Sequence, residues 1–368
     1  MRMQAAVLRA GDGPFAVEEV DIAEPGPGQV LVRVAAVGFC HTDVLPRGEG
    51  FPARPPIIAG HEGVGVVQAL GPGVTEPAVG SHVLLSFDHC GACENCLDGH
   101  PAYCRSFVQR NLTGTGTSTE SGGGPVTDAD GKPVASRWFG QSSFATHAVV
   151  DARNTVAVDP DLPLELLAPL GCGVQTGAGS ILLALGVRAG SRVVVFGAGG
   201  VGLAAVMAAR VAGAATIVAV DLHENRLDLA QELGATHVLL GSADGVPRQL
   251  RKITGGGADY VLDTTGVPEV IRDGVDSLRV RGAIGLVGAQ SRDLVLGPAA
   301  LSTGKTVTGI LEGDAVPRRF LPQLIELWRQ GRFPFERLVR TYPLSEINTA
   351  ERDAASGVTV KPVLLPGS

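Results

Sequence analysis

The pattern of apolar and polar residues divides the chain into parts of different texture. In the first part, short strand-like runs at residues 5–8, 30–37, 63–70 and 82–85 alternate with turns rich in Pro and Gly. This alternation predicts a β-rich, barrel-like domain. Residues 111–137 hold many Gly, Ser and Thr and few apolar groups, which predicts a long surface loop with short strands.

A later part of the chain alternates strand-like runs with helical stretches. The runs occur at residues 192–196, 214–220, 236–240, 259–263 and 282–288. Strands that alternate with helices predict an α/β fold with a doubly wound parallel sheet, here between about 174 and 313. The stretch 193–209 carries no charge, but glycines interrupt it, so a nucleotide-binding fold explains it better than a membrane span.

The end of the chain becomes amphipathic. Between 317 and 329, apolar residues recur at helical spacing: Phe320, Leu321, Leu324, Ile325 and Trp328. We expect this segment to return to the first domain. The predicted domains are therefore 1–173 together with 314–368, and 174–313.

Composition and charge exclude several kinds of partner. The 368 residues are 45% hydrophobic and 18% charged, which fits a globular protein of about two domains. A formal net charge of -7, without a run of Lys and Arg, argues against binding to nucleic acid. No signal peptide is visible at the N-terminus, so we expect a cytoplasmic protein that does not bind membranes.

A glycine motif lies between the first strand and the first helix of the predicted sheet. It reads Gly197-Ala198-Gly199-Gly200-Val201-Gly202, and residues 203–212 after it are rich in helix formers. In such a motif, Gly197 permits a tight turn, Gly199 lets backbone amides approach a pyrophosphate, and Gly202 allows close packing of helix on strand. Strand, motif and helix together predict a dinucleotide site.

The acid that follows the second strand indicates which dinucleotide is bound. Asp221 stands about twenty residues past the glycines. A carboxylate there accepts hydrogen bonds from ribose hydroxyls and repels a 2'-phosphate, which favours NAD over NADP. Arg226 either reaches the same ribose or is a solvated cation on the helix surface, and the sequence does not decide between the two.

Four of the six cysteines stand within fifteen residues. Cys90, Cys93, Cys96 and Cys104 form a C-x2-C-x2-C-x7-C pattern, compact enough to hold a structural zinc from one loop. Two disulfides would be the alternative in a secreted domain, but the absence of a signal peptide disfavours it.

The other two cysteines are far apart, and each lies beside glycines. Cys40 and Cys172, with His61 between them in the sequence, would supply two thiolates and one imidazole to a zinc with an open fourth position. Spacing alone favours two buried thiols and a core histidine. The neighbouring glycines and the dinucleotide motif favour the catalytic zinc.

Five motifs in this order resemble the zinc-dependent medium-chain alcohol dehydrogenases over nearly the whole chain. They are Cys40-His41-Thr42-Asp43, Gly60-His61-Glu62-Gly63, the four-cysteine loop, Gly171-Cys172-Gly173-Val174-Gln175-Thr176-Gly177 and the glycine motif. The sequence around Cys172 is most similar to that of the aryl-alcohol (benzyl alcohol) branch. The resemblance implies a GroES-like catalytic domain, a Rossmann domain, two zinc ions per chain and a homodimer or homotetramer.

The resemblance also implies roles for individual residues. Glu62 would approach the catalytic zinc, with an ordinary buried acid beside a cation as the alternative. Thr42 would accept the substrate proton, and Thr176 would pack against the nicotinamide. Leu45 replaces a histidine that passes this proton to solvent in many relatives. His41 replaces an arginine that holds the pyrophosphate, and we expect a weaker grip because an imidazole is mostly neutral at pH 7.

The substrate is the least determined feature. Ser86 and Phe87 align roughly with pocket-lining positions of relatives, and a small residue there leaves room for a ring. We therefore expect primary aromatic or allylic alcohols and their aldehydes as substrates. Two alternatives are a glutathione-dependent formaldehyde dehydrogenase, which needs a cationic pocket, and a zinc- and nucleotide-binding protein without catalytic activity.

Overall fold

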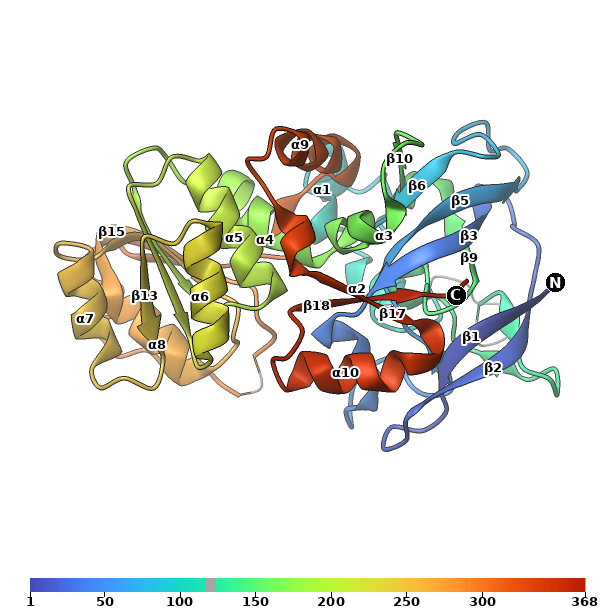
Figure 1. Ribbon diagram of the computed structural model, residues 1–368, viewed down its shortest axis with the longest axis horizontal. Helices are drawn as coiled ribbons and strands as arrows, with labels where there is room; N and C mark the ends of the chain where they lie inside the picture. Colours follow the sequence, from blue (N-terminus) through green and yellow to red (C-terminus); the bar gives the residue numbers. More distant parts are fainter. Residues whose placement is uncertain (117–123, 291, 368) are drawn as a thin grey trace. The chain divides into compact units, whose positions relative to one another are not determined.

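The computed structural model describes residues 1–116, 124–290 and 292–367. Contacts divide the chain into two compact units (Figure 1). The first comprises Met1–Cys172, Val316–Pro322 and Glu336–Ser368, and the second comprises Gly173–Ala315 and Gln323–Phe335. The predicted domain limits instead assigned the whole of 314–368 to the first domain.

Within the described residues, two sheets form the first unit. One has the order β4-β1-β2-β7-β8, and the other has the order β10-β6-β5-β3-β18-β17, with β9 also paired to β3. The strands are β1 Arg2–Leu8, β2 Phe15–Ile22, β3 Gln29–Gly38, β4 Ile57–Ile58, β5 Glu62–Leu70, β6 His82–Leu85, β7 Val126–Thr127, β8 Pro133–Val134, β9 His147–Asp151, β10 Thr155–Val158, β17 Val339–Pro343 and β18 Lys361–Leu365. Their helices are α1 Glu94–Leu97, α2 Phe107–Asn111, α3 Leu164–Leu167 and α10 Ile347–Ala355.

Aromatic residues fill the core between these sheets. Phe39, next to the end of β3, stacks on Phe144 with ring centroids 5.5 Å apart, and Phe15 of β2 meets Phe144 edge-on at 5.8 Å. All three side chains are buried. This cluster fixes the end of β3, where the residues after Phe39 begin the candidate site.

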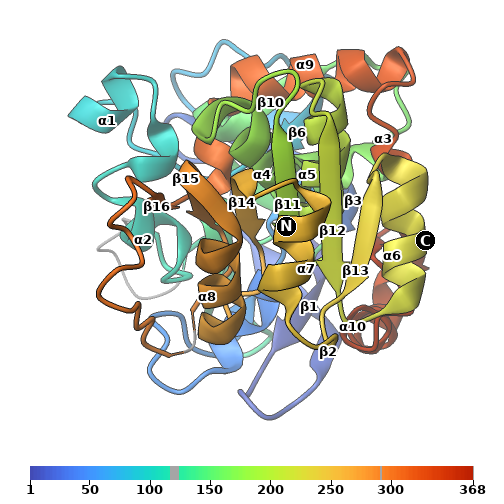
Figure 2. The same cartoon turned by 90° about the vertical axis from the view of Figure 1, so that its left-hand side faces the viewer.

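The second unit contains a six-stranded parallel sheet in the order β13-β12-β11-β14-β15-β16 (Figure 2). Its strands are β11 Arg192–Phe196, β12 Thr216–Asp221, β13 His237–Leu240, β14 Ala258–Asp263, β15 Leu278–Leu286 and β16 Thr306–Gly309. The helices are α4 Gly173–Gly179, α5 Gly200–Val211, α6 Glu224–Leu233, α7 Val246–Ile253 and α8 Pro268–Ser277. Helices α5 and α6 lie on one face and α7 and α8 on the other (Figure 1). The order 3-2-1-4-5-6 is that of a Rossmann fold.

The predicted α/β fold class, a doubly wound parallel sheet plus a β-rich GroES-like part, is confirmed. The central strand β11 is apolar and buried from Val193 to Phe196 because helices cover both faces of the sheet. Strand β15 begins four residues before the predicted run at 282, because its first residues include exposed Arg279 and Arg281 and so lack an apolar pattern.

Helix α9 spans Pro317–Arg329, the range predicted from its apolar spacing. The predicted surface loop at 111–137 includes residues 117–123, which lie outside the described residues, and β7 and β8 follow that gap. No single described helix has both the length and the apolar character needed to cross a membrane.

Candidate active site and metal centres

Three segments of the first unit bring the catalytic candidates together. Cys40 follows β3, and His61 and Glu62 stand at the start of β5, the antiparallel neighbour of β3. Cys172 follows a short 3-10 helix, Ala168–Gly171, that packs against β5. One ligand atom from each of Cys40, His61, Glu62 and Cys172 lies within 4.8 Å of the other three. Residues up to 132 positions apart in sequence therefore form one cluster of metal-binding groups.

A buried carboxylate orients the His61 ring. Nδ1 of His61 lies 2.7 Å from Oδ1 of Asp43, which also accepts hydrogen bonds from the Gly60 amide at 2.9 Å and the Trp138 indole N–H at 3.0 Å. Burial favours a neutral ring, but the charge and hydrogen bond of Asp43, together with the neighbouring Cys40, raise the pKa of His61 well above its usual value. This contact stabilises a cation, either a proton or a metal ion, on the opposite nitrogen.

That opposite nitrogen tests the site for zinc. Nε2 of His61 is buried and has no hydrogen-bond partner among the described residues. A buried polar atom is rarely left without a partner, so the atom points to a group that binds here. Two thiols and one imidazole are a donor set that suits zinc, and the residues therefore fit the predicted metal.

The Cys40 thiol favours its ionised form. Its contact with Cys172, the charge of Lys361 and its contact with His61 together lower the pKa of Cys40 well below its usual value, against the opposing effect of burial. Thr42 is half-buried, and its Oγ1 lies 3.7 Å from Sγ of Cys40. The hydroxyl predicted to relay a proton thus stands beside the predicted ligand.

Glu62 has the cationic partner that the sequence analysis gave as its alternative, and the structure identifies this partner as Lys361. Lys361 Nζ donates to Oε1 at 2.8 Å and to Oε2 at 2.9 Å, and both side chains are buried. Burial raises the pKa of Glu62 although Lys361 opposes this, whereas the Glu62 charge raises the pKa of Lys361 in spite of its burial. Gly38 makes the pair possible, because a Cβ there would overlap Oε2 of Glu62. Lys361 stands 299 residues along the chain, so no local motif indicated it.

The four-cysteine loop has the geometry of a metal cage. The sulfurs of Cys90, Cys93, Cys96 and Cys104 all lie within 4.8 Å of one another. Sγ of Cys96 lies 3.9 Å from that of Cys90 and 3.5 Å from that of Cys93. A zinc tetrahedron with ~2.3 Å bonds places its sulfurs about 3.8 Å apart, while a disulfide needs about 2 Å. The sulfurs fit zinc, and the disulfide alternative is excluded for this arrangement.

Backbone amides complete this loop. The Cys93 and Ala92 amides donate to Sγ of Cys90 at 3.2 and 3.4 Å, and the Cys90 amide donates to Sγ of Cys104 at 3.3 Å. The Ala92 contact lowers the pKa of Cys90, whereas burial raises the pKa of Cys96 to about 12. Without a cation, the loop therefore does not hold four thiolates at once.

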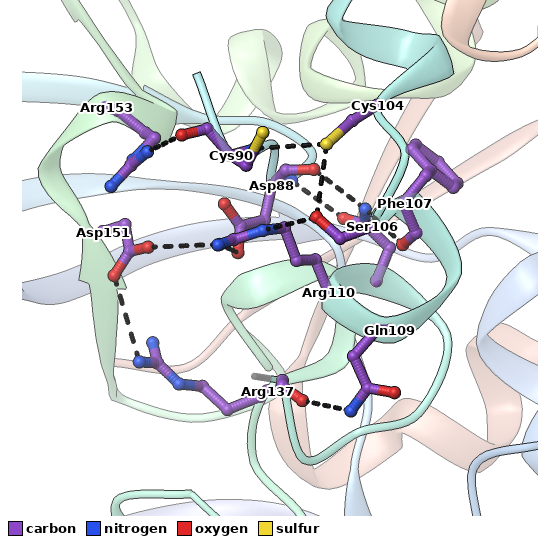
Figure 3. A network of polar contacts seen from close by, with 12 residues as sticks. Asp88, Cys90, Cys104, Ser106, Phe107, Gln109, Arg110, Arg137, Asp151 and Arg153 are labelled. Atoms are coloured by element: carbon purple, nitrogen blue, oxygen red, sulfur yellow. Dashed lines mark hydrogen bonds and ion pairs between the residues drawn. The ribbon is translucent and has the colours of Figure 1, made fainter. Parts of the chain in front are cut away.

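Charged residues tie the loop to its surroundings (Figure 3). Arg110 donates to Asp88 at 3.0 Å and to the Ser106 hydroxyl at 3.1 Å, and this hydroxyl lies 3.4 Å from Sγ of Cys104. Arg153 donates to the backbone carbonyl of Cys90. The loop is thus held from several sides by side chains of the first unit.

The remaining predicted residues of the first unit have varied surroundings. His41 is exposed in the 3-10 helix His41–Arg47, and Leu45 of the same helix packs against the core. Ser86 is buried and donates to the Gly171 carbonyl at 2.8 Å, so its hydroxyl is engaged by the backbone next to Cys172. Phe87 is buried and lines a small cavity that Arg153 and Arg318 also line.

In the second unit, a cavity of about 330 Å³ opens at the glycine motif. Gly197 and Gly199 line it, and Gly200 and Val201 form the first turn of α5. Gly197 has φ 89°, a left-handed conformation that favours glycine, and a Cβ on Gly202 would overlap the Gly197 carbonyl. The turn and the close packing predicted for these two glycines are thus present, and the N-terminus of α5 borders the cavity.

Asp221 and Arg226 line the same cavity. Asp221 is buried at the end of β12, where it accepts hydrogen bonds from the Ala198 amide at 2.6 Å and the His223 amide at 2.9 Å. Nε of Arg226 is buried without a partner among the described residues. Arg226 is therefore not a fully solvated cation on the helix surface. Its side chain forms part of the lining of the cavity.

Thr176 stands in α4 and is buried. Its hydroxyl lies 3.4 Å from Oε2 of Glu312, which also accepts a hydrogen bond from Gln175 at 3.2 Å. Glu312 is a buried acid that the sequence analysis did not single out. Its residue type carried no signal, since it follows an ordinary strand-like run.

The fold and the site together define a two-unit dehydrogenase with a zinc-type donor cluster and a dinucleotide cavity. The family described as "Alcohol dehydrogenase GroES-like domain" matches residues 26–160, and the family described as "Zinc-binding dehydrogenase" matches residues 200–329. Together they match most of the chain.

Individual relatives agree. The chain is 46% identical to the geraniol dehydrogenase of Castellaniella defragrans, over 98% of this chain and 97% of that one. The crystal structure of an alcohol dehydrogenase zinc-binding domain protein from Burkholderia ambifaria has a TM-score of 0.95 at 48% identity, covering 100% and 99% of the two chains. Benzyl alcohol dehydrogenase from Acinetobacter calcoaceticus has a TM-score of 0.94 at 43% identity, covering 99% of each.

The chain belongs to the zinc-dependent medium-chain alcohol dehydrogenase family. The predicted family is therefore confirmed, and the predicted cofactors, zinc and NAD, agree with this membership. An alcohol is the class of small-molecule substrate that the membership supports.

Proposed function

We propose that this alcohol dehydrogenase interconverts primary aromatic or allylic alcohols and their aldehydes by hydride transfer to and from NAD. The observation that carries the catalytic part is the cluster of Cys40, His61 and Cys172, with Nε2 of His61 buried and unpartnered among the described residues. These three residues would hold a catalytic zinc, with Glu62 close enough to approach it. Cys90, Cys93, Cys96 and Cys104 would hold a structural zinc.

A zinc ion bound by the first set supplies a Lewis acid that polarises an alcohol or carbonyl oxygen. Asp43 holds the His61 ring in the tautomer whose Nε2 faces the cluster, and Lys361 keeps the Glu62 charge balanced inside the protein. Thr42, beside Cys40, would accept the substrate proton at its hydroxyl oxygen and pass its own proton toward the ribose of the dinucleotide.

The chain lacks the next member of the relay found in many relatives. Leu45 is apolar and packs against the core, so it cannot carry a proton. We infer that the proton leaves through the ribose or through water. His41 would contact the pyrophosphate weakly, and replacing it with arginine should tighten NADH binding and slow turnover if product release limits the rate. Unchanged NADH affinity in His41→Arg would contradict this role.

The choice of NAD over NADP rests on Asp221. Its carboxylate lines the dinucleotide cavity and is held by two backbone amides, so it cannot swing away from an incoming phosphate. A 2'-phosphate would bring a dianion beside it, which like-charge repulsion disfavours. The adjacent Arg226 would contact the adenosine ribose.

The substrate class rests on two kinds of support. The small residue Ser86 stands near Cys172 through its bond to the Gly171 carbonyl, which leaves room for an extended or ring-bearing alcohol. The relatives named above include one geraniol dehydrogenase and one benzyl alcohol dehydrogenase. Both names denote primary alcohols activated by an adjacent double bond or ring.

The test is a set of initial rates with geraniol, benzyl alcohol and straight-chain primary alcohols, each with NAD and with NADP. S-hydroxymethylglutathione is assayed alongside these alcohols. We expect the largest kcat/KM for geraniol or benzyl alcohol with NAD, and about two zinc ions per chain by metal analysis. Preference for S-hydroxymethylglutathione would instead support the formaldehyde dehydrogenase alternative, and one zinc per chain with no turnover would support a non-catalytic protein.

We further propose that the first unit is the catalytic domain and the second the NAD-binding domain. The dinucleotide cavity lies wholly in the second unit, and both cysteine clusters lie in the first. The cytoplasm as the location of the enzyme remains an expectation, which fractionation of cells that express the protein would check.

A further inference from the structure

A second cavity, of about 120 Å³, lies in the first unit beside the four-cysteine loop. Phe87 and Pro317 form part of its wall and are buried, whereas Arg153 and Arg318 are exposed. The cavity therefore runs inward from a surface that carries two guanidinium groups. Its volume is far more than the ~10–15 Å³ that one water molecule requires.

Neither arginine at this cavity is neutralised. Arg318 donates from Nη2 to the Ala152 carbonyl at 2.7 Å and from Nε to the Thr155 carbonyl at 3.2 Å. Arg153 donates to the Cys90 carbonyl, as Figure 3 shows. In the described part of the chain, neither guanidinium has a carboxylate within ion-pair distance. Two cations are thus fixed in place by neutral carbonyl groups, and their remaining N–H groups stay available.

Two acids close to this region in the sequence are already engaged by other arginines. Asp88 forms an ion pair with Arg110 at 3.0 Å, and Asp151 lies 3.9 Å from both Arg110 and Arg137. The two acids therefore face other arginines. The local charge at the cavity remains positive.

Two residues that line the cavity carry buried polar atoms without partners among the described residues. Asn154 is 4% exposed, and neither its Nδ2 nor its Oδ1 has a hydrogen-bond partner among the described residues. His89 also lines the cavity, and its Nδ1 is buried without a hydrogen-bond partner among the described residues. Buried groups of this kind are costly unless a ligand or ordered water satisfies them.

We propose that this cavity binds a small oxyanion of the phosphate class. The two guanidinium groups would bind its oxygens, as arginine does at phosphate sites. Asn154 presents one donor and one acceptor, and a phosphate that keeps a proton at neutral pH both accepts and donates hydrogen bonds. The bound anion would hold Arg153 in place, where it donates to the Cys90 carbonyl of the four-cysteine loop.

The proposal is tested by titrating inorganic phosphate into the zinc-loaded protein by calorimetry, at constant ionic strength maintained with NaCl. Saturating NADH is present, so that phosphate does not occupy the dinucleotide cavity. We expect one phosphate per chain, with affinity at least tenfold lower in Arg318→Gln and in Asn154→Leu, a substitution of similar shape. Arg319→Gln is the matched control, because Arg319 is also exposed on α9 but does not line the cavity; its affinity should stay within twofold of the wild type.

Three results would contradict the proposed phosphate site. The heats of phosphate titration could be no larger than those with NaCl, or the wild type, Arg318→Gln and Asn154→Leu could bind phosphate with equal affinity. A crystal soaked in phosphate could also show only water in the cavity. Arg318→Gln also removes two hydrogen bonds to backbone carbonyls, so its thermal unfolding midpoint is measured without phosphate. If Arg318→Gln proves to be unfolded, the test of the site rests on Asn154→Leu. A phosphomonoester that competes with phosphate would identify a metabolite's phosphate group as the source, and one that does not would identify the free ion. Because the two variants are outside the catalytic cluster, loss of phosphate binding is distinguishable from failure of the proposed dehydrogenase activity.

Discussion

At the scale of single residues, the geometry of the candidate cluster of Cys40, His61, Glu62 and Cys172 depends on side chains outside the cluster. Asp43 receives three hydrogen bonds at one oxygen, from His61, Gly60 and Trp138, and the other oxygen accepts from the Cys40 amide at 3.1 Å. One buried carboxylate therefore positions the histidine ligand and the backbone of a cysteine ligand together. Outer partners of this kind commonly change metal affinity as much as some ligands do.

Trp138 offers a test of this positioning. In Trp138→Phe the ring remains, but Asp43 loses an N–H donor and the His61 ring is held less firmly. We expect roughly 10- to 100-fold weaker zinc affinity at the catalytic cluster, the range found for outer partners of metal ligands. The measurement is zinc release to a coloured chelator, followed over time. Trp328→Phe, the other tryptophan, is the control, and equal release rates in both variants would refute the role of Trp138.

The buried pair of Glu62 and Lys361 makes a second residue prediction. Lys361→Met removes the cation and leaves a buried carboxylate without its partner, which should lower the free energy of unfolding by about 3–5 kcal/mol. Urea unfolding measures the effect. The double variant Glu62→Gln/Lys361→Met should recover most of the loss, because no unpaired charge remains. A double variant as unstable as the single one would show that packing, and not charge, dominates at Lys361.

At the scale of elements, the turn between β11 and α5 places its glycines in different surroundings. A Cβ on Gly202 would overlap the Gly197 carbonyl, whereas a Cβ on Gly199 would meet no atom within 4 Å. Gly202 thus serves packing within the fold. The space beside Gly199 is available to a ligand, as expected for a pyrophosphate bound at a helix N-terminus.

These glycines form a matched pair of variants. Gly202→Ala should cost about 1–3 kcal/mol of stability, because the helix must move away from the turn. Gly199→Ala should leave the urea midpoint nearly unchanged but weaken NADH binding by about tenfold or more, which is ~1.4 kcal/mol. Fluorescence titration with NADH and urea unfolding separate the two effects. If Gly199→Ala bound NADH as tightly as wild type, the cavity at the glycine motif would not be the pyrophosphate site.

The cysteine loop shows how one element can be built around a ligand. Its helices are short, α1 with four residues and the 3-10 turn Pro101–Tyr103 with three, and α1 contains no buried residue. The sulfurs lie at the spacing of a tetrahedral cage, and amides and arginines surround them. A metal ion held by these sulfurs would replace the hydrophobic core that such a short segment cannot supply.

At the scale of the whole molecule, the edge of the parallel sheet indicates an assembly surface. Strand β16 ends the sheet at one edge, and Val280, Val295, Leu301 and Leu311 are exposed in the chain around β15 and β16. Unpaired strand edges and exposed apolar residues commonly mark contacts between subunits. We propose that a second copy of the chain covers this edge, in a homodimer or a tetramer built from dimers.

Light scattering during gel filtration tests the assembly. We expect a mass two or four times the 37.7 kDa of one chain. Val280→Lys should shift the equilibrium toward the single chain, because a charge at a subunit contact is costly to bury. Val79→Lys is the matched control, since Val79 is 61% exposed and Val280 is 60% exposed. A single-chain mass for the wild type would end this proposal.

The sequence predicted a large share of these features from local signals. The glycine motif between a strand and a helix located the dinucleotide turn, the spacing of four cysteines located the compact cage, and apolar periodicity gave helix α9 its limits. Each signal comes from residues close together in the chain. In such cases the backbone geometry of one turn, loop or helix determines what the residues can do.

The sequence could not supply contacts made between distant segments. Lys361 meets Glu62 across 299 positions, Trp138 meets Asp43 across 95, and no local pattern marks either partner. The neighbouring glycines and the dinucleotide motif brought Cys40, His61 and Cys172 into one hypothesis, whereas spacing alone favoured core residues. The start of β15 was misplaced because its exposed arginines carry no apolar pattern.

Residue types and short spacings by themselves therefore determined the chemistry that this chain offers: thiolates, an imidazole, a carboxylate and a glycine turn. Tertiary structure alone decided which of these groups meet, how the His61 ring is turned, and which charges are paired or left free at Arg153 and Arg318. The physical reason is the separation in sequence between the residues that interact. The geometry of a turn, a helix or a cysteine cage is set by residues close together in the chain, whereas burial and charge pairing depend on neighbours that only the folded chain brings together.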